Sequence, residues 1–304
     1  MSRPKPPFTR GTISLGASCN NRCLFCFYAA GRDLPDRTTT EVFTEIERAR
    51  EFVSGDILTL SGGEPTIRTD IVQLCAYALR AGFKGVNLQT NGRALADRDL
   101  ARALARNGMK SCFVSLHADT PALYERLTGA KGGFDEVVEG LGNLEELGVS
   151  FSVNVVITRD NYRRLPQIYA FLRMAFASFK SLRLSYPRIT GAALSNFCKV
   201  VPRFGEIGPY VRRTLRLAEQ DGVEALCDLI PTCVLAQYAD CDIARHRKPY
   251  YISDPAPAGP LGLDYSLKYD FCSRCAALDF CCGVPREYAK RFPYRPELSP
   301  MEKL

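Results

Sequence analysis

The sequence predicts an α/β fold: a partial (β/α)6 barrel of parallel strands, followed by a small, irregular, cysteine-rich domain. Short apolar runs alternate with helical patterns of about 10–15 residues, which indicates βαβ units and therefore a parallel sheet. Right-handed crossovers curl such units in one direction into an open barrel. Near Tyr186 the alternation stops, and cysteines cluster toward the C-terminus. We place the barrel at residues 1–190 and the second domain at residues 191–304.

The individual elements follow from hydrophobic periodicity and from the residues that begin and end helices. Strands are expected at Thr12–Ala17, Ile57–Leu60, Val86–Gln89, Cys112–His117, Val149–Ile157 and Leu182–Ser185. Between them, helices are expected at Thr39–Val53, Ile71–Leu79, Asp97–Arg106, Phe134–Leu147 and Tyr162–Phe179. Side-chain oxygens of Thr39 or Thr40, and of Thr69 or Asp70, are expected to cap the first two helices.

Beyond Tyr186 the pattern is weaker. A helix is expected at Pro209–Gln220, with the arginines Arg212, Arg213 and Arg216 facing solvent. Val223–Ile230 is a possible extra strand. The stretch Ala244–Ser266 is rich in proline and glycine, which predicts an irregular loop over or beside the barrel mouth.

Composition places the chain among globular proteins. Of its 304 residues, 46% are apolar and 24% charged, which is typical of a protein that fills a core. No apolar run approaches the length of a membrane span, and Met1–Pro7 lacks the apolar core of a signal peptide. We therefore expect a cytoplasmic protein without a membrane partner, in which thirteen cysteines indicate metal binding. The net charge of +7 permits an acidic partner, but the charges are scattered and nucleic acid is not expected.

Three cysteines with CxxxCxxC spacing, Cys19, Cys23 and Cys26, follow the first strand. Four thiolates normally hold a [4Fe–4S] cluster, so three leave one iron open, as a catalytic metal site requires. With Phe25 before the third cysteine, the motif closely resembles that of radical S-adenosylmethionine (SAM) enzymes. The resemblance implies a cluster that binds and reductively cleaves SAM, and a 5′-deoxyadenosyl radical that abstracts hydrogen from the substrate. A disulfide pair and a zinc site lacking a ligand are the alternatives.

The segment Ser61-Gly62-Gly63-Glu64-Pro65 follows the second strand. Glycines let a backbone approach a ligand closely, and a carboxylate accepts hydrogen bonds from an ammonium group. In this position the segment resembles the GGE motif of the same family, which implies that Gly62, Gly63 and Glu64 hold SAM. The family also contacts SAM after its fourth and fifth strands, which implies Ser115 and Asn154 here.

Two further features of the barrel have a structural and a functional interpretation. His117 lies at a strand end, where a histidine is more often a hydrogen-bonded structural residue than a catalyst. Gly132-Gly133-Phe134 looks like the same region in peptide-modifying members of the family, and an ordinary glycine loop before a helix explains it equally well.

A second metal site is predicted from the C-terminal cysteines. The spacing CxxC-x5-C resembles the SPASM or twitch extension of radical SAM enzymes, which carries auxiliary [4Fe–4S] clusters. The full SPASM pattern needs one more cysteine, where this chain has Pro285, so we expect a single auxiliary cluster. The expected ligands are Cys233, Cys272, Cys275 and Cys281, with Cys241 and Cys282 as rivals. A tetrahedral zinc site with four cysteine ligands would use the same residues.

The resemblance implies a radical SAM oxidoreductase or maturase supplied with electrons by a donor such as flavodoxin or ferredoxin. An auxiliary cluster fits an oxidative outcome, because the substrate radical must lose an electron to a nearby acceptor. We expect oxidative modification of a ribosomally made peptide. The alternatives are dehydrogenation or rearrangement of a small polar metabolite such as an amino sugar or cyclitol, and a non-catalytic zinc-binding interaction protein.

Overall fold

The computed structural model describes residues 8–246, 248–254, 265–293 and 298–302. Its main feature is one eight-stranded sheet with the order β7-β6-β5-β4-β3-β2-β1-β8, in which all paired strands are parallel. The strands are β1 Gly11–Ser14, β2 Ile57–Ser61, β3 Gly85–Thr90, β4 Met109–Ser115, β5 Ser150–Val156, β6 Ser181–Ser185, β7 Glu224–Asp228 and β8 Tyr251–Ser253. A separate antiparallel pair is formed by β9 Ser266–Leu267 and β10 Val284–Pro285.

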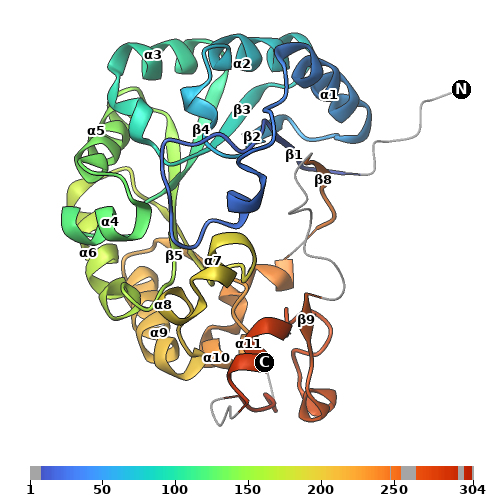
Figure 1. Cartoon of the computed structure of the whole chain (residues 1–304), viewed down its shortest axis with the longest axis vertical. Coiled ribbons are helices and arrows are strands. Elements are labelled where there is room, and N and C mark those ends of the chain that lie inside the picture. Colours follow the sequence, from blue (N-terminus) through green and yellow to red (C-terminus); the bar gives the residue numbers. More distant parts are fainter. Residues whose placement is uncertain (1–7, 247, 255–264, 294–297, 303–304) are drawn as a thin grey trace, which may run out of the picture.

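Helices follow the strands and lie along the outside of the curved sheet, while the loop after β1 (blue) lies inside this arc (Figure 1). The α-helices are α1 Thr39–Phe52, α2 Ile71–Arg80, α3 Arg98–Arg106, α4 Pro121–Thr128, α5 Gly133–Glu146, α6 Leu165–Ala175, α7 Gly191–Ser195, α8 Phe197–Val200, α9 Phe204–Gln220, α10 Thr232–Leu235 and α11 Arg286–Arg291. Short 3-10 helices are η1 Phe27–Gly31, η2 Pro65–Ile67, η3 Arg93–Ala96, η4 Tyr162–Arg164, η5 Ala236–Cys241, η6 Ile243–His246 and η7 Asp270–Arg274. No helix within the described part of the chain is both long and apolar enough to span a membrane.

The two faces of the sheet differ in polarity. Side chains of the outer face, such as Leu58, Leu88 and Val153, are fully buried among the helices. Side chains that alternate with them, such as Asn87 and Ser111, are half-buried on the inner face and hydrogen bond across strands (Ser111 Oγ to Asn87 Oδ1, 2.8 Å). Burial against helices on one face therefore stabilises the fold, and the other face is left polar.

The predicted α/β barrel is confirmed, with changes at its edges. All six predicted strands are present, and the possible strand at Val223–Ile230 is β7, which pairs with β6. The expectation of a wholly irregular stretch at Ala244–Ser266 is wrong, because β8 lies in it and pairs with β1. Residues 247 and 255–264 of that stretch lie outside the described residues. The sheet thus continues past residue 190.

The predicted helix caps are wrong in detail. Thr38 caps α1 through a capping box with Glu41, so neither Thr39 nor Thr40 does so. The Asp70 carboxylate makes no cap bond; it accepts hydrogen bonds from Arg68 and from Thr39 Oγ1 (2.7 Å). The cap of α1 is thus a local motif, whereas Thr39 and Asp70 are used in a contact between α1 and the segment before α2.

The bounds of two helices differ from the prediction. The predicted helix Tyr162–Phe179 begins as η4 and ends at Ala175. The predicted helix at Pro209 begins at Phe204 and contains that proline. On this helix Arg212 is half-buried and donates to Val234 O (2.7 Å), so the expectation that it faces solvent is wrong, whereas Arg213 and Arg216 are exposed.

Candidate active site

The cluster loop, which we define as residues 15–26, is held by three neighbouring segments. The Asp36 carboxylate accepts hydrogen bonds from Ala17 N (2.8 Å) and Ser18 N (3.1 Å). On the other side, the end of α4 accepts hydrogen bonds from Arg22 N and Leu24 N, at Thr128 O (2.7 Å) and Leu127 O (3.0 Å). The segment after β2 supplies the third set of contacts. A loop without regular structure is thereby given a defined path.

Cys19, Cys23 and Cys26 are all half-buried in this loop. Burial raises the pKa of Cys23 to about 12, and the neighbouring Cys26 and Cys19 contribute to the rise. Cys26 N donates to Cys23 O (3.2 Å), so the last two cysteines share one turn. Burial also raises the pKa of Cys19. Three crowded, partly desolvated thiols become thiolates only beside positive charge, which iron ions supply. These residues therefore fit the [4Fe–4S] cluster that the motif implies.

The glycine pair after β2 packs directly against the cluster loop. Gly63 N donates to Gly16 O (2.8 Å), and Glu64 N donates to Ser18 O (2.8 Å). A Cβ at position 63 would lie 2.1 Å from Ser18 O, and Gly62 has a φ of +136°. Both positions therefore require glycine because two loops meet there, whether or not a ligand also approaches.

The Glu64 side chain is only 2% exposed. Its Oε1 accepts hydrogen bonds from Thr66 N (2.9 Å), Thr66 Oγ1 (2.5 Å) and Thr90 Oγ1 (2.6 Å), and its Oε2 accepts one from Asn91 N (2.5 Å). Burial raises the pKa of this carboxyl, and the hydrogen bonds oppose that effect. Each carboxylate oxygen has two lone pairs; Oε1 already accepts three hydrogen bonds and Oε2 only one, so the acceptor position left for a ligand ammonium is at Oε2.

We expect Glu64→Gln to weaken SAM binding about tenfold or more, since a charge-assisted hydrogen bond contributes about 1.5–3 kcal/mol. Titration of the reconstituted protein with SAM measures this. Thr66→Val is the matched control, because it removes one protein donor to Glu64 and keeps the carboxylate. Equal SAM affinity in wild type and Glu64→Gln would show that the carboxylate only holds the loops together.

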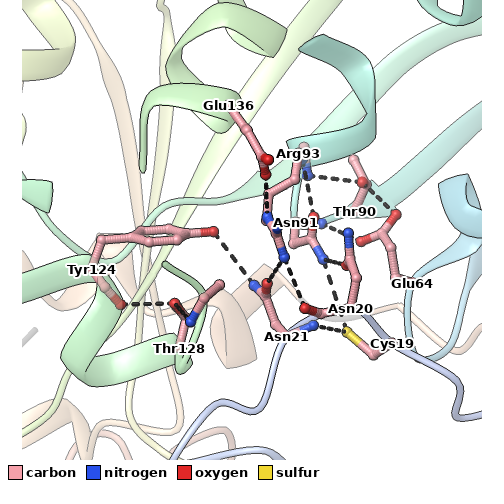
Figure 2. Close-up of polar contacts among 12 residues, drawn as sticks. Cys19, Asn20, Asn21, Glu64, Thr90, Asn91, Arg93, Tyr124, Thr128 and Glu136 are labelled. Carbon is pink, nitrogen blue, oxygen red and sulfur yellow. Dashed lines mark hydrogen bonds and ion pairs between the residues drawn. The ribbon is translucent and has the colours of Figure 1, made fainter. Parts of the chain in front are cut away.

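A polar network connects Glu64 to the cluster loop (Figure 2). Asn91 N binds Glu64, and Asn91 Nδ2 donates to Asn20 Oδ1 (2.6 Å) and lies 3.9 Å from Cys19 Sγ. Arg93 Nη1 donates to Asn20 O (2.8 Å) and Asn21 Oδ1 (2.9 Å), and Arg93 Nε pairs with the Glu136 carboxylate (2.5 Å). The segment that follows β3 therefore fixes the turn between the first two cysteines.

Ser115 and Asn154 lie side by side at the C-terminal ends of β4 and β5, where they are paired in register. Asn154 Oδ1 accepts a hydrogen bond from Ser185 Oγ (2.7 Å) on β6. Both side chains are half-buried on the polar inner face. The structure thus brings these two predicted SAM contacts together at the same end of the sheet as the cluster loop.

His117 lies just beyond β4 and is 3% exposed. Its Nδ1 accepts a hydrogen bond from Val156 N (3.0 Å), and its ring makes an edge contact with Phe25 of the cluster loop (centroids 4.8 Å apart). Burial lowers the pKa of His117 to about 3. A neutral histidine with these contacts supports the structural interpretation of this residue.

The depressed pKa predicts a pH dependence of stability. Between about pH 3 and pH 6.5 the unfolded chain binds a proton at His117 and the folded chain does not, so stability is lost as the pH falls below about 6.5. We expect His117→Gln to reduce the difference in unfolding free energy between about pH 7 and about pH 5.5 by about 1 kcal/mol, measured by urea titration. The chain has two histidines, and the exposed His246 provides the control His246→Gln. An unchanged difference in His117→Gln would contradict the prediction.

The four cysteines predicted to form a second metal site line one apolar pocket. Cys233 comes from α10, Cys272 from η7, and Cys275 and Cys281 from the segment that follows η7. Most of the other lining side chains are apolar, such as Leu267. Burial raises the pKa of Cys233 to about 11, and each of the other three thiols contributes to the rise, so the four are neighbours. This set fits a four-thiolate cluster.

The two rival cysteines lie outside the lining of this pocket. The neighbouring Cys282 thiol lowers the pKa of Cys281 to about 5, and Cys282 Sγ donates a hydrogen bond to Gly283 O (3.4 Å). The pKa of Cys241 is raised to about 11 by burial and is affected by Asp240 and Glu219 rather than by the four thiols. Within the described ranges, no three His, Cys, Asp or Glu side chains are grouped around one metal ion.

Four residues that position the site belong to no motif that the sequence alone reveals: Asp36, Arg32, Arg93 and Glu136. Each acts through a contact with a distant part of the chain, as between Arg93 and Asn20. Asn91 could have been found from the sequence, because it directly follows a predicted strand within Gln89-Thr90-Asn91-Gly92. A polar side chain directly after a parallel strand is placed at the edge where such sites form.

Comparison with known proteins agrees with this geometry. Residues 13–172, more than half of the chain, match the Radical SAM superfamily. The chain is 36% identical over 157 residues to Fe-coproporphyrin III synthase of Methanosarcina barkeri, covering 51% of this chain and 38% of that protein. It is 30% identical over 178 residues to mycofactocin maturase MftC of Mycolicibacterium smegmatis, covering 57% and 44%. The chain spans less than half the length of either relative.

The fold is similar to that of SuiB from Streptococcus suis. SuiB bound to S-adenosylmethionine superposes with a TM-score of 0.64 and 16% identity, covering 97% of this chain and 76% of SuiB. SuiB bound to its precursor peptide SuiA gives a TM-score of 0.59 and 17% identity, covering 73% and 49%. At such identity the likeness shows the fold alone. The family match includes Cys19, Cys23, Cys26 and Glu64, and the chain therefore belongs to the radical SAM superfamily of enzymes, which use a [4Fe–4S] cluster and SAM.

Proposed function

We propose that this enzyme oxidatively modifies a ribosomally made peptide. In this proposal Cys19, Cys23 and Cys26 hold the cluster that binds SAM. A single auxiliary [4Fe–4S] cluster is held by Cys233, Cys272, Cys275 and Cys281. An electron donor such as flavodoxin or ferredoxin reduces the protein.

The observation that carries the proposal is the apolar pocket lined by four neighbouring thiols. A hydrogen atom taken from a substrate leaves a carbon radical, and loss of one electron and one proton then completes a two-electron oxidation. A second cluster in the same chain supplies an acceptor for that electron. Apolar surroundings and limited solvent exposure are among the features that set the potential of such a cluster.

When bound, the cluster and SAM would supply the radical chemistry that removes a hydrogen atom from the substrate. The residues of this chain bind and orient. Oε2 of Glu64 accepts a hydrogen bond from the SAM ammonium, and Gly62 and Gly63 keep its loop against the cluster loop. Ser115 and Asn154 contact SAM from the ends of their strands, and the surrounding protein keeps water from the reacting atoms.

The peptide substrate is supported by the relative mycofactocin maturase MftC, and SuiB, which shares the fold, has been crystallised with a precursor peptide. Gly132 and Gly133, whose region looks like that of peptide maturases, form the N-cap and the first residue of α5. They pack beside the site, since an added Cβ on Gly133 would lie 3.0 Å from Arg93 Nε. An extended peptide can bind at the open mouth of a partial barrel through main-chain hydrogen bonds.

A second candidate is a small polar metabolite such as an amino sugar or cyclitol. It is favoured by the polar inner face, where Ser61 Oγ donates to Gln89 Oε1 (2.6 Å) and Ser185 Oγ donates to Asn154 Oδ1. A few placed polar groups are what a small-molecule site uses for orientation. The relative Fe-coproporphyrin III synthase also carries a small-molecule name.

The test incubates anaerobically reconstituted enzyme, SAM and reductant with short peptides encoded beside its gene, and weighs the products. We expect one peptide to lose two hydrogen atoms in step with 5′-deoxyadenosine release. The same reaction run without peptide is the control for uncoupled SAM cleavage. No change in any peptide mass, together with loss of two hydrogens from an amino sugar or cyclitol, would decide for the second candidate.

A further inference from the structure

Two arginines bind the backbone of the turn between the first two cluster cysteines. Arg93, at the start of η3, donates from Nη1 to Asn20 O (2.8 Å). Arg32, at the C-terminal cap of η1, donates from Nη2 to Asn21 O (3.1 Å). The adjacent carbonyls of Asn20 and Asn21 therefore each accept a hydrogen bond from a guanidinium group, and the two arginines come from different elements.

The two guanidinium groups differ in how far their charge is neutralised. Arg93 has a side chain 15% exposed and pairs with Glu136, which is 44% exposed. Arg32 is half-buried, and no carboxylate of the described ranges forms an ion pair with it. Its Nη2 donates to Asn21 O, which lies between Cys19 and Cys23 in the chain, so its charge lies beside the turn that joins these two cysteines.

We propose that Arg32 and Arg93 are positioning residues that hold the Asn20–Asn21 turn and raise the reduction potential of the SAM-binding cluster. This inference rests on the proposed function of Cys19, Cys23 and Cys26 as cluster ligands. Reduction adds negative charge to a cluster already bound by three thiolates, and a fixed nearby cation stabilises the reduced form more than the oxidised form. Net charge and hydrogen bonding around a cluster are known means of setting its potential.

The pairing pattern predicts both the order and the sign of the effects. Arg32→Gln removes a charge that has no acidic partner among the described residues, and it should lower the potential most. Arg93→Gln removes a charge already paired with Glu136 and should lower it less. Glu136→Gln removes the negative partner of Arg93 and should raise the potential. A purely structural role has no reason to give opposite signs for Arg93→Gln and Glu136→Gln.

The experiment measures iron per chain and then the midpoint potential of each reconstituted variant without SAM, by redox titration followed by electron paramagnetic resonance. The triple alanine variant of Cys19, Cys23 and Cys26 supplies the auxiliary-cluster spectrum for subtraction. At a fixed potential we expect the ratio of reduced to oxidised cluster to fall about tenfold in Arg32→Gln, equivalent to about 59 mV for a one-electron couple. Arg32→Lys should restore most of this ratio. Arg98→Gln is the control, since Arg98 is exposed on α3 and pairs with Glu146.

Unchanged potentials in Arg32→Gln and Glu136→Gln, with full iron content, would overturn the inference. If Arg32→Gln does not retain iron, Arg93→Gln and Glu136→Gln decide the matter, and shifts of the same sign in both would count against it. Wild-type protein in which the three cysteines hold no iron would instead contradict the proposed function, and the two failures are therefore distinguishable.

Discussion

The variant in which Cys19, Cys23 and Cys26 are all replaced by alanine is expected to release no 5′-deoxyadenosine from SAM in the presence of dithionite. These three thiols lie half-buried on the cluster loop, and without them no iron should be held next to residues 62–64. The effect should be complete, because every later step depends on cleavage of SAM. The auxiliary iron should remain, since its cysteines lie in a different pocket.

The measurement is chromatographic detection of 5′-deoxyadenosine, with iron counted on the same preparation. Cys198→Ala is the matched control: Cys198 is an exposed cysteine on α8 and belongs to neither predicted ligand set. Its iron content and SAM cleavage should equal those of the wild type. Continued 5′-deoxyadenosine release by the triple variant would refute the assignment.

Replacing two of the C-terminal cysteines is expected to remove one cluster and to abolish oxidation of the peptide. Wild-type protein should hold about eight irons, because each of two cubane clusters contains four, and replacing Cys272 and Cys275 by alanine should leave about four. The variant should still cleave SAM but should yield no oxidised peptide, because the substrate radical loses its electron acceptor. Iron analysis, SAM cleavage and product mass together measure this.

Cys241→Ala is the control for the auxiliary site, since Cys241 does not line the pocket and should be dispensable for iron binding. A wild-type content of four irons and one zinc would support the tetrahedral zinc alternative. Full peptide oxidation by the double variant would show that the electron leaves the substrate by another route.

Much of the fold was predictable because its signals are local. An apolar run followed by a helical pattern specifies a βα unit within one short segment, and the right-handed crossover then orders consecutive strands as neighbours. β1 to β6 follow this rule. The position of β8 does not follow this rule, because β8 pairs with β1 although strands β2 to β7 lie between them in the sequence. Only three residues long, that strand carries too little periodicity to be recognised.

The sequence by itself determined which cysteines belong to the CxxxCxxC motif, because the spacing of three ligands on one loop is a local property. It also indicated Gly62 to Glu64 by their place after a strand. The tertiary structure decided how Glu64 is satisfied, because its donors Thr90 and Asn91 come from the next strand. It likewise decided that Cys233 joins Cys272 in one pocket, and that Arg93 reaches Asn20 across more than seventy residues. Such contacts form only when the chain has folded, since side chains distant in sequence approach one another through packing of the elements that carry them.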